Sequence, residues 1–209
     1  MGQGGVVAEH PASSPHSESV PPEQVLRLAA FADGPGGGNP AGVVLDASHL
    51  TDAGMQRIAT EVGYAETAFV VDPGRSANDR TVRLRYFSPR AKVPFCGHAT
   101  VATAVTLAER RGVGPFAIDT PVGRVLIATS RDAAGAGDGP VTASFTSVEP
   151  ALRDLDSDVA GHLLSLLGLQ RADLDETWPL REAYAGNWNP IVAVREQVVS
   201  THFASTRPR

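Results

Sequence analysis

The segment at residues 97–111 most constrains the fold of this chain, because its apolar residues cover every side of a helix. Ala, Val and Leu fill most of its positions before the first charged residue, and Thr100, Thr103 and Thr106 are the polar interruptions. A helix that is apolar all round is usually buried. Two arginines stand in the last turn and Gly112 follows, as expected at a helix end. The sequence therefore predicts a central helix enclosed by other elements.

The start of this helix carries chemically useful groups. Cys96, Gly97 and His98 bring a thiol, a backbone without a side chain and an imidazole to its positive end. Free backbone N–H groups at a helix start bind anions, so a substrate carboxylate could dock there. The alternative is that Gly97 and His98 merely cap a core helix.

Composition restricts the class of protein. The chain has 209 residues, 42% of them hydrophobic and 20% charged, enough for a real core in one large domain or two small ones. A net charge of −5 without any block of Lys or Arg argues against nucleic acid or an acidic membrane surface as partner. A single cysteine allows no internal disulfide, and neither a membrane-spanning apolar run nor a signal peptide pattern is present. We therefore expect a cytoplasmic protein.

Periodicity predicts the remaining elements. Residues 1–23 are rich in Gly, Ser and Pro and are expected to form a disordered leader. Residues 133–140 are expected to be a flexible link, and residues 178–188 to be irregular. We predict strands at 24–31, 43–45, 64–71, 82–87, 116–120, 124–128, 141–148 and 190–194, and further helices at 52–62 and 159–169. A glycine-rich loop at 34–42 contains Asn39, whose amide can both donate and accept hydrogen bonds.

Glu66 is the strongest candidate for acid/base chemistry. It stands between small and apolar residues at the start of a strand that should be buried, so its carboxylate is expected to be desolvated and able to exchange protons near neutral pH. The alternative is a surface glutamate at a strand end. Cys96 is a rival nucleophile because it lies at a helix start near His98, although a buried packing role is the commoner fate of a free cysteine. No other His or Cys keeps a ligand spacing with His98, so the sequence predicts no metal site.

Several motifs occur in an order typical of one family. They are GGNPA at 37–41, MQRIA at 55–59, ETAFV at 66–70, YFSP at 86–89 and CGHAT at 96–100. Together they resemble the phenazine-biosynthesis PhzF-like isomerases, which share the diaminopimelate epimerase fold. The resemblance is dense over residues 25–123 and thinner to about residue 198. It implies an α+β fold of two similar halves, each a curved sheet wrapped around a central helix, with the active site between them.

The resemblance also implies roles for particular residues. Glu66 matches the family's catalytic glutamate, which moves a proton between carbons of a small unsaturated acid without a cofactor. Gly97, His98 and Ala99 match the helix-start segment that lines the substrate pocket, and Asn39 matches the loop that closes over the substrate. Neither a cofactor nor a metal is implied.

The division into halves follows from the same resemblance. We expect a first half-domain at 24–123 and a partial second half-domain at 124–209. The family's second half continues into another sheet and a second central helix, so we expect this chain to be truncated at its C-terminal side or to be completed by another copy in a homodimer. A non-catalytic remnant that serves as a binding or interaction domain is the alternative to an isomerase.

Overall fold

The computed structural model of the chain describes residues 24–32, 34, 36–74, 76, 79–131 and 139–195. The predicted leader at 1–23 and residues 133–138 of the predicted link lie outside these ranges.

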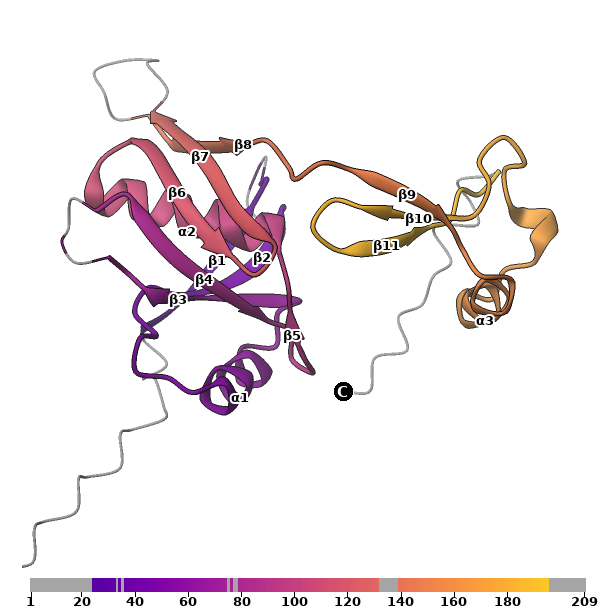
Figure 1. The fold of residues 1–209 in the computed structure, drawn as a ribbon, viewed down its shortest axis with the longest axis horizontal. Helices are drawn as coiled ribbons and strands as arrows, with labels where there is room; N and C mark the ends of the chain where they lie inside the picture. Colours follow the sequence, from indigo (N-terminus) through magenta and orange to yellow (C-terminus); the bar gives the residue numbers. More distant parts are fainter. Residues whose placement is uncertain are drawn as a thin grey trace, which may run out of the picture.

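A large mixed sheet forms most of the first part of the molecule (Figure 1). Its strand order is β1-β2-β3-β4-β6-β7-β8, and β5 pairs with β4. The pairs β2–β3 and β4–β6 are parallel and the other neighbours are antiparallel. The strands are β1 (Val25–Ala30), β2 (Asn39–Val44), β3 (Glu66–Asp72), β4 (Thr81–Phe87), β5 (Lys92–Val93), β6 (Gly114–Thr120), β7 (Gly123–Arg131) and β8 (Val141–Phe145).

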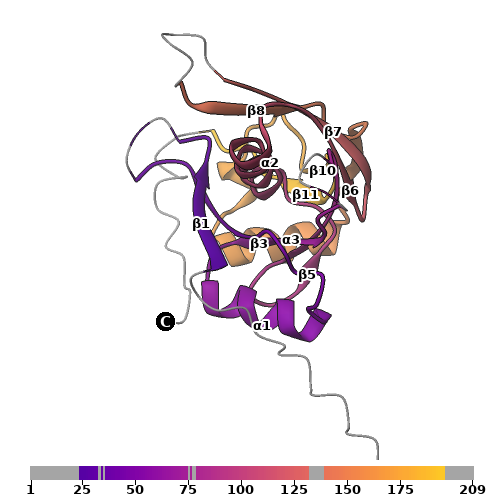
Figure 2. The same cartoon turned by 90° about the vertical axis from the view of Figure 1, so that its left-hand side faces the viewer.

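The sheet curls around helix α2 (Gly97–Arg111), which Figure 2 shows end-on with strands on several sides. This helix contacts β1, β2, β3, β7 and β8, which include both ends of the strand order. Its residues from Ala99 to Ala104 are all buried, as are Thr106, Leu107 and Ala108. The predicted central helix and the α+β class are therefore confirmed. Burial drives the arrangement, because a sheet that wraps around this helix removes every side of it from water.

The three threonines of α2 are buried without being left unpaired. Each hydroxyl donates to the carbonyl four residues earlier: Thr100 to Cys96 at 2.6 Å, Thr103 to Ala99 at 2.7 Å and Thr106 to Ala102 at 2.9 Å. Because the helix itself supplies these acceptors, a threonine can sit in an apolar core at little cost.

Helix α1 (Asp52–Val62) covers the other side of the sheet, where it contacts β3 and β4. Met55, Ile58, Ala59 and Val62 are buried, as the helical spacing predicts. They belong to a second cluster that also holds Phe69 and Phe87. The Thr51 hydroxyl caps the start by accepting from the Gly54 N–H, and Gly63 ends the helix in the left-handed conformation.

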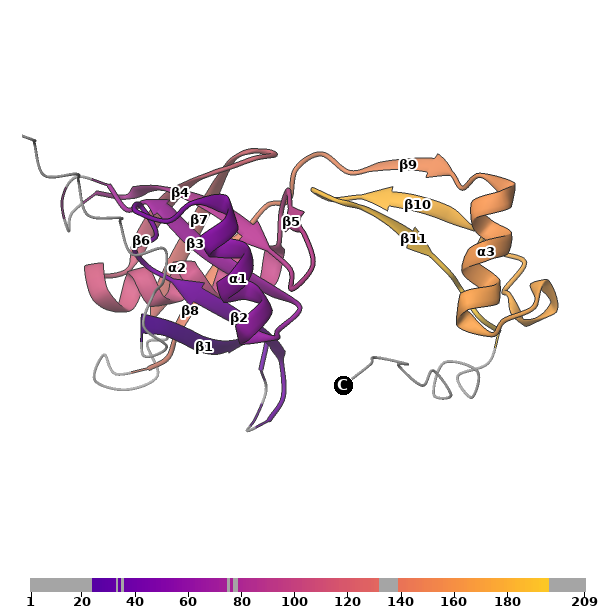
Figure 3. The ribbon, with the colours of Figure 1, turned by 90° about the horizontal axis from the view of Figure 1, so that it is seen from below.

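A second, smaller sheet follows (Figure 3), with strands β9 (Ala151–Asp154), β10 (Arg181–Tyr184) and β11 (Trp188–Ile191) side by side in antiparallel order. Between β9 and β10 lie helix α3 (Ser157–Leu167) and a short 3-10 helix at Arg171–Asp173. The expectation of an irregular segment at 178–188 is wrong, because this stretch contains β10 and the start of β11. The turn between them uses Gly186 at a φ of 108°, a conformation that favours glycine.

Several predicted element bounds differ from the structure by a few residues, and two of the differences concern the first sheet. Asn39 begins strand β2 instead of lying in a loop, because residues 39–44 pair along their whole length with β1. Strands β7 and β8 belong to the first sheet, so that sheet extends beyond the half-domain boundary expected at residue 123. Strand pairing decides both boundaries, and a pattern within one segment does not reveal its partner.

Among the described residues, no helix combines the length and apolar character needed to cross a membrane.

Candidate active site

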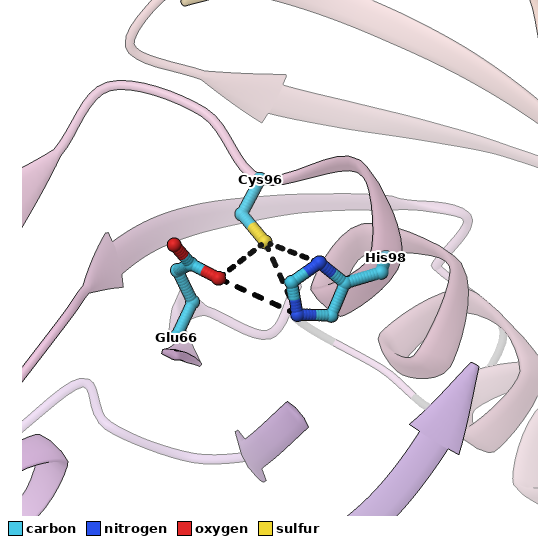
Figure 4. Close-up of side chains that lie close together, drawn as sticks. All are labelled: Glu66, Cys96 and His98. Carbon is cyan, nitrogen blue, oxygen red and sulfur yellow. Dashed lines mark hydrogen bonds and ion pairs between the residues drawn. The ribbon is translucent and has the colours of Figure 1, made fainter. Parts of the chain in front are cut away.

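Three reactive side chains meet at the start of α2 (Figure 4). Glu66 is the first residue of β3, Cys96 is the N-cap residue of α2, and His98 is the second residue of that helix. We call these residues the Glu66–Cys96–His98 cluster. The structure therefore brings together the predicted acid/base, the rival nucleophile and the predicted pocket histidine.

The contacts within the cluster converge on one carboxylate oxygen. The Cys96 thiol donates to Glu66 Oε2 at 3.6 Å, and His98 Nε2 lies 3.5 Å from the same oxygen. Cys96 Sγ also lies 3.2 Å from His98 Nδ1. Figure 4 shows the second carboxylate oxygen of Glu66 directed away from both partners. One oxygen is thus held by Cys96 and His98, and the other points away from both.

Burial gives the cluster a partly desolvated environment. The side chain of Glu66 is 26% exposed and that of His98 is 11% exposed, and Cys96 is buried. Burial raises the pKa of the Cys96 thiol to about 12, the neighbouring Glu66 charge adds to the rise, and the Ala99 N–H opposes it. At neutral pH the sulfur is therefore a protonated hydrogen-bond donor, which disfavours thiolate catalysis.

The helix start supplies backbone N–H groups beside this cluster. Cys96 occupies the N-cap position in an extended conformation, and its side chain makes no capping hydrogen bond. Gly97 adds no side chain in front of this turn, and a Cβ there would meet only Phe145 Cζ, at 3.6 Å. The start of α2 therefore keeps the geometry that binds a carboxylate.

Two predicted pocket residues take more limited positions. Ala99 is fully buried in the main core, so only its backbone can face a ligand. Asn39 is exposed at the start of β2. It stands two residues before Ala41, whose partner in β3 is Glu66, so Asn39 lies at the same edge of the sheet. It is a neighbour of the Glu66–Cys96–His98 cluster without being part of it.

A buried hydrogen-bond chain supports the helix start from within the core. The Thr100 hydroxyl donates to the Cys96 carbonyl, and the Tyr86 hydroxyl lies 2.7 Å from Thr100 Oγ1. Both side chains are fully buried. Because the Thr100 proton is used at Cys96, Tyr86 is the donor in the second bond.

Sequence reasoning missed a contact from the smaller sheet. Asn187, in the β10–β11 turn, donates from Nδ2 to the carbonyl of Phe95 at 2.5 Å, and Gly186 packs against the Phe95 ring. Phe95 immediately precedes the cluster residue Cys96. The Gly-Asn pair is a hairpin-turn signal that could have located this turn, but nothing local indicates where it docks.

A mixed sheet curled around one buried helix is the architecture of an epimerase-like fold, and here a carboxylate and an imidazole stand at the start of that helix. Residues 28–206 match the model of the PhzC-PhzF family, described as phenazine biosynthesis-like protein. The chain therefore belongs to this family, and the predicted resemblance is confirmed.

Similar proteins agree with this assignment. An uncharacterised isomerase of Bacillus subtilis is 33% identical over 175 residues, covering 82% of this chain and 56% of that protein. The trans-2,3-dihydro-3-hydroxyanthranilate isomerase of Pseudomonas chlororaphis is 33% identical over 159 residues, covering 76% of this chain and 52% of the enzyme. The structure of a predicted epimerase from Pseudomonas aeruginosa superposes with a TM-score of 0.69 at 26% identity, covering 81% of this chain and 58% of that one. The diaminopimelate epimerase-like fold is thus confirmed, and the chain spans little more than half the length of these proteins.

Proposed function

We propose that this chain carries the acid/base centre of a cofactor-independent isomerase or epimerase that acts on a small carboxylate-bearing metabolite. The observation that supports this most directly is the position of Glu66: a half-buried carboxylate with one oxygen held by Cys96 and His98, beside the open start of a buried helix. The names of the relatives, which are isomerases, support the same reaction class.

In the proposed reaction, the substrate carboxylate binds backbone N–H groups in the first turn of α2. The helix end stabilises the negative charge that develops next to this carboxylate when a proton leaves the adjacent carbon. The free oxygen of Glu66 takes that proton and returns it to another carbon, or to the same carbon from a new direction. The proton is therefore conserved, and the reaction requires no oxidant or reductant.

Within this mechanism the neighbours of Glu66 are positioning residues. The Cys96 thiol and His98 Nε2 fix Oε2, so the other oxygen keeps one orientation toward the ligand. A preorganised base loses less entropy when it reacts than a freely rotating one.

The test is deuterium incorporation, followed by NMR in D₂O. The 209-residue chain is incubated with trans-2,3-dihydro-3-hydroxyanthranilate, the substrate that the name of the Pseudomonas chlororaphis relative specifies, and with other small unsaturated carboxylates. We expect exchange to fall by about 100-fold or more in Glu66→Gln, because an amide cannot accept the carbon-bound proton. Glu61→Gln, an exposed change on α1, is the matched control and should retain full exchange.

Unchanged exchange in Glu66→Gln would remove Glu66 from the mechanism. Binding of the carboxylate without exchange in the unaltered chain would instead favour the alternative function, a binding domain.

A further inference from the structure

The Glu66–Cys96–His98 cluster has the donor atoms of a transition-metal site. It offers one carboxylate oxygen, one sulfur and one imidazole nitrogen, all within 4.8 Å of one another. Sulfur and imidazole ligands select Zn²⁺ and similar ions over Mg²⁺ and Ca²⁺, which prefer oxygen. Residue spacing does not indicate such a site, because Glu66 lies 30 residues from Cys96 and only the fold brings them together.

The distances between the donors match one face of a ligand tetrahedron. Zn²⁺ bonds of about 2.3 Å to sulfur and about 2.0–2.2 Å to nitrogen and oxygen give edges of about 3.5 Å to sulfur and about 3.3 Å between nitrogen and oxygen. Here Sγ lies 3.6 Å from Oε2 and 3.7 Å from Nε2, and Nε2 lies 3.5 Å from Oε2. Each edge therefore agrees with a tetrahedral ion to within a few tenths of an ångström. Because Sγ lies closer to Nδ1, at 3.2 Å, the imidazole has to turn about its side-chain bonds to direct the Nε2 lone pair at the ion, while the backbone stays in place.

The charge of the three ligands and the hydrogen bonds behind them also suit a divalent metal ion. A carboxylate, a thiolate and a neutral imidazole together neutralise a divalent cation, which matters in a half-buried site. The backbone of Cys96 is fixed from behind by the Tyr86–Thr100 hydrogen-bond chain, and such outer partners hold metal ligands in place.

We propose that Glu66, Cys96 and His98 bind one Zn²⁺-like transition-metal ion, with a fourth position open to water or to a substrate oxygen. On binding, the sulfur–hydrogen bond is exchanged for a sulfur–metal bond and the proton passes to solvent, with no change of oxidation state. If the proposed function holds, the ion also weakens the acid/base, because coordination through Oε2 withdraws negative charge from the whole Glu66 carboxylate and makes its other oxygen less basic. Zn²⁺ then acts as a reversible inhibitor of proton transfer.

The site is tested by titrating the tag-free, EDTA-treated 209-residue chain with Zn²⁺ by calorimetry and with Co²⁺ by absorption. We expect one ion per chain and a sulfur-to-cobalt charge-transfer band. Cys96→Ser should abolish the band, and Cys96→Ser and His98→Gln should each weaken binding by about tenfold or more. His162→Gln, an exposed change on α3, should leave both signals unchanged. Circular dichroism checks that each variant is folded, and Cys96→Ala is the substitute if the serine variant is not.

Absence of binding at millimolar Zn²⁺ overturns the site, and so does equal affinity in folded Cys96→Ser and His98→Gln variants. The inhibitory consequence is measured separately, as deuterium exchange with one equivalent of Zn²⁺ and again after EDTA. Exchange that persists at saturating Zn²⁺ contradicts it. Absence of exchange in the metal-free chain would instead contradict the proposed function, while the titration still decides the metal site.

Discussion

The hydrogen-bond chain from Tyr86 through Thr100 to the Cys96 carbonyl allows a sharp test of how the helix start is held. Its two bonds measure 2.7 Å and 2.6 Å, and both side chains are fully buried. Burial also raises the pKa of the Tyr86 hydroxyl, so it stays a protonated donor. Removing different hydroxyls from this hydrogen-bond chain leaves different polar groups without a partner. The free energy of unfolding should therefore differ between the variants.

Tyr86→Phe removes a donor and leaves no buried donor unpaired, so we expect a loss of about 1 kcal/mol in the free energy of unfolding. Thr100→Val preserves shape but leaves the Tyr86 hydroxyl buried without an acceptor, so we expect a loss of about 2–3 kcal/mol. The double variant removes both partners and should lose about 1 kcal/mol. Tyr86→Phe should therefore destabilise the unaltered chain and stabilise the Thr100→Val variant.

Urea unfolding followed by far-UV circular dichroism measures these differences at equal m-values. Tyr64→Phe is the matched control at a half-buried tyrosine, and should change stability by less than about 0.5 kcal/mol. Additive losses in the Tyr86/Thr100 cycle would refute the reasoning, because additivity means that the two hydroxyls do not depend on each other.

Two further predictions concern the surroundings of the helix start. Gly186→Ala should destabilise the docking of the β10–β11 turn by about 1–3 kcal/mol in urea unfolding, since the new Cβ would lie 2.5 Å from Phe95 Cδ1 at a φ of 108°. The control is Gly161→Ala on α3, where the new Cβ meets open space, and it should be neutral or stabilising. Burial raises the pKa of the Cys96 thiol to about 12, so at pH 7.5 it should react with iodoacetamide about 100-fold or more slowly than free cysteine. Mass spectrometry measures the labelling, which should become rapid when the protein is unfolded in urea. Labelling at the rate of free cysteine in the folded chain would show that the thiol is neither buried nor protonated as described.

The local sequence pattern is enough to predict a helix whose apolar residues lie on one face, as in α1, or on every side, as in α2. The predicted helix at 52–62 matches α1 at both ends, because Thr51, Gly63 and the buried face are all encoded within that one segment. The central helix was equally clear, because an all-apolar wheel leaves no alternative to burial. The fold label came from the resemblance. Glu66 and His98 were candidates on their local sequence as well as on the resemblance, and the structure adds that Glu66 Oε2 and His98 Nε2 lie 3.5 Å apart.

Features that depend on distant partners could not be predicted in this way. The capping of the α2 C-terminus is an example. Arg80 donates to the carbonyls of Arg111 and Gly112, which lie 31 and 32 residues further along the sequence. On α3, Leu164 is buried but Leu166 is 71% exposed, although both belong to the same leucine-rich stretch. A helical pattern indicates which residues share a face, but the packing partner decides how much of that face is covered.

The meeting of Glu66 with Cys96 follows from strand order. Strand β4 runs antiparallel to β3, so its last residue, Phe87, pairs with Thr67 at the edge where Glu66 stands. The chain then turns and β5 runs back along β4, with Val93 opposite Tyr86. Cys96 follows three residues later, so a short return segment is sufficient to close a separation of 30 residues.

The turn at residues 88–91 therefore sets the geometry of the Glu66–Cys96–His98 cluster. The Ser88 N–H donates to the Ala91 carbonyl at 2.8 Å, and α1 fixes the same turn from outside, where Gln56 Nε2 donates to the Ser88 carbonyl at 2.8 Å. A shift of one residue in β5 would move the following chain by about 3.3 Å and reverse the faces of its side chains. That displacement is nearly as long as the contacts within the cluster, so none of them would survive it. Helix α1, which contributes no atom to the cluster, is in this way one of the elements that hold its distances.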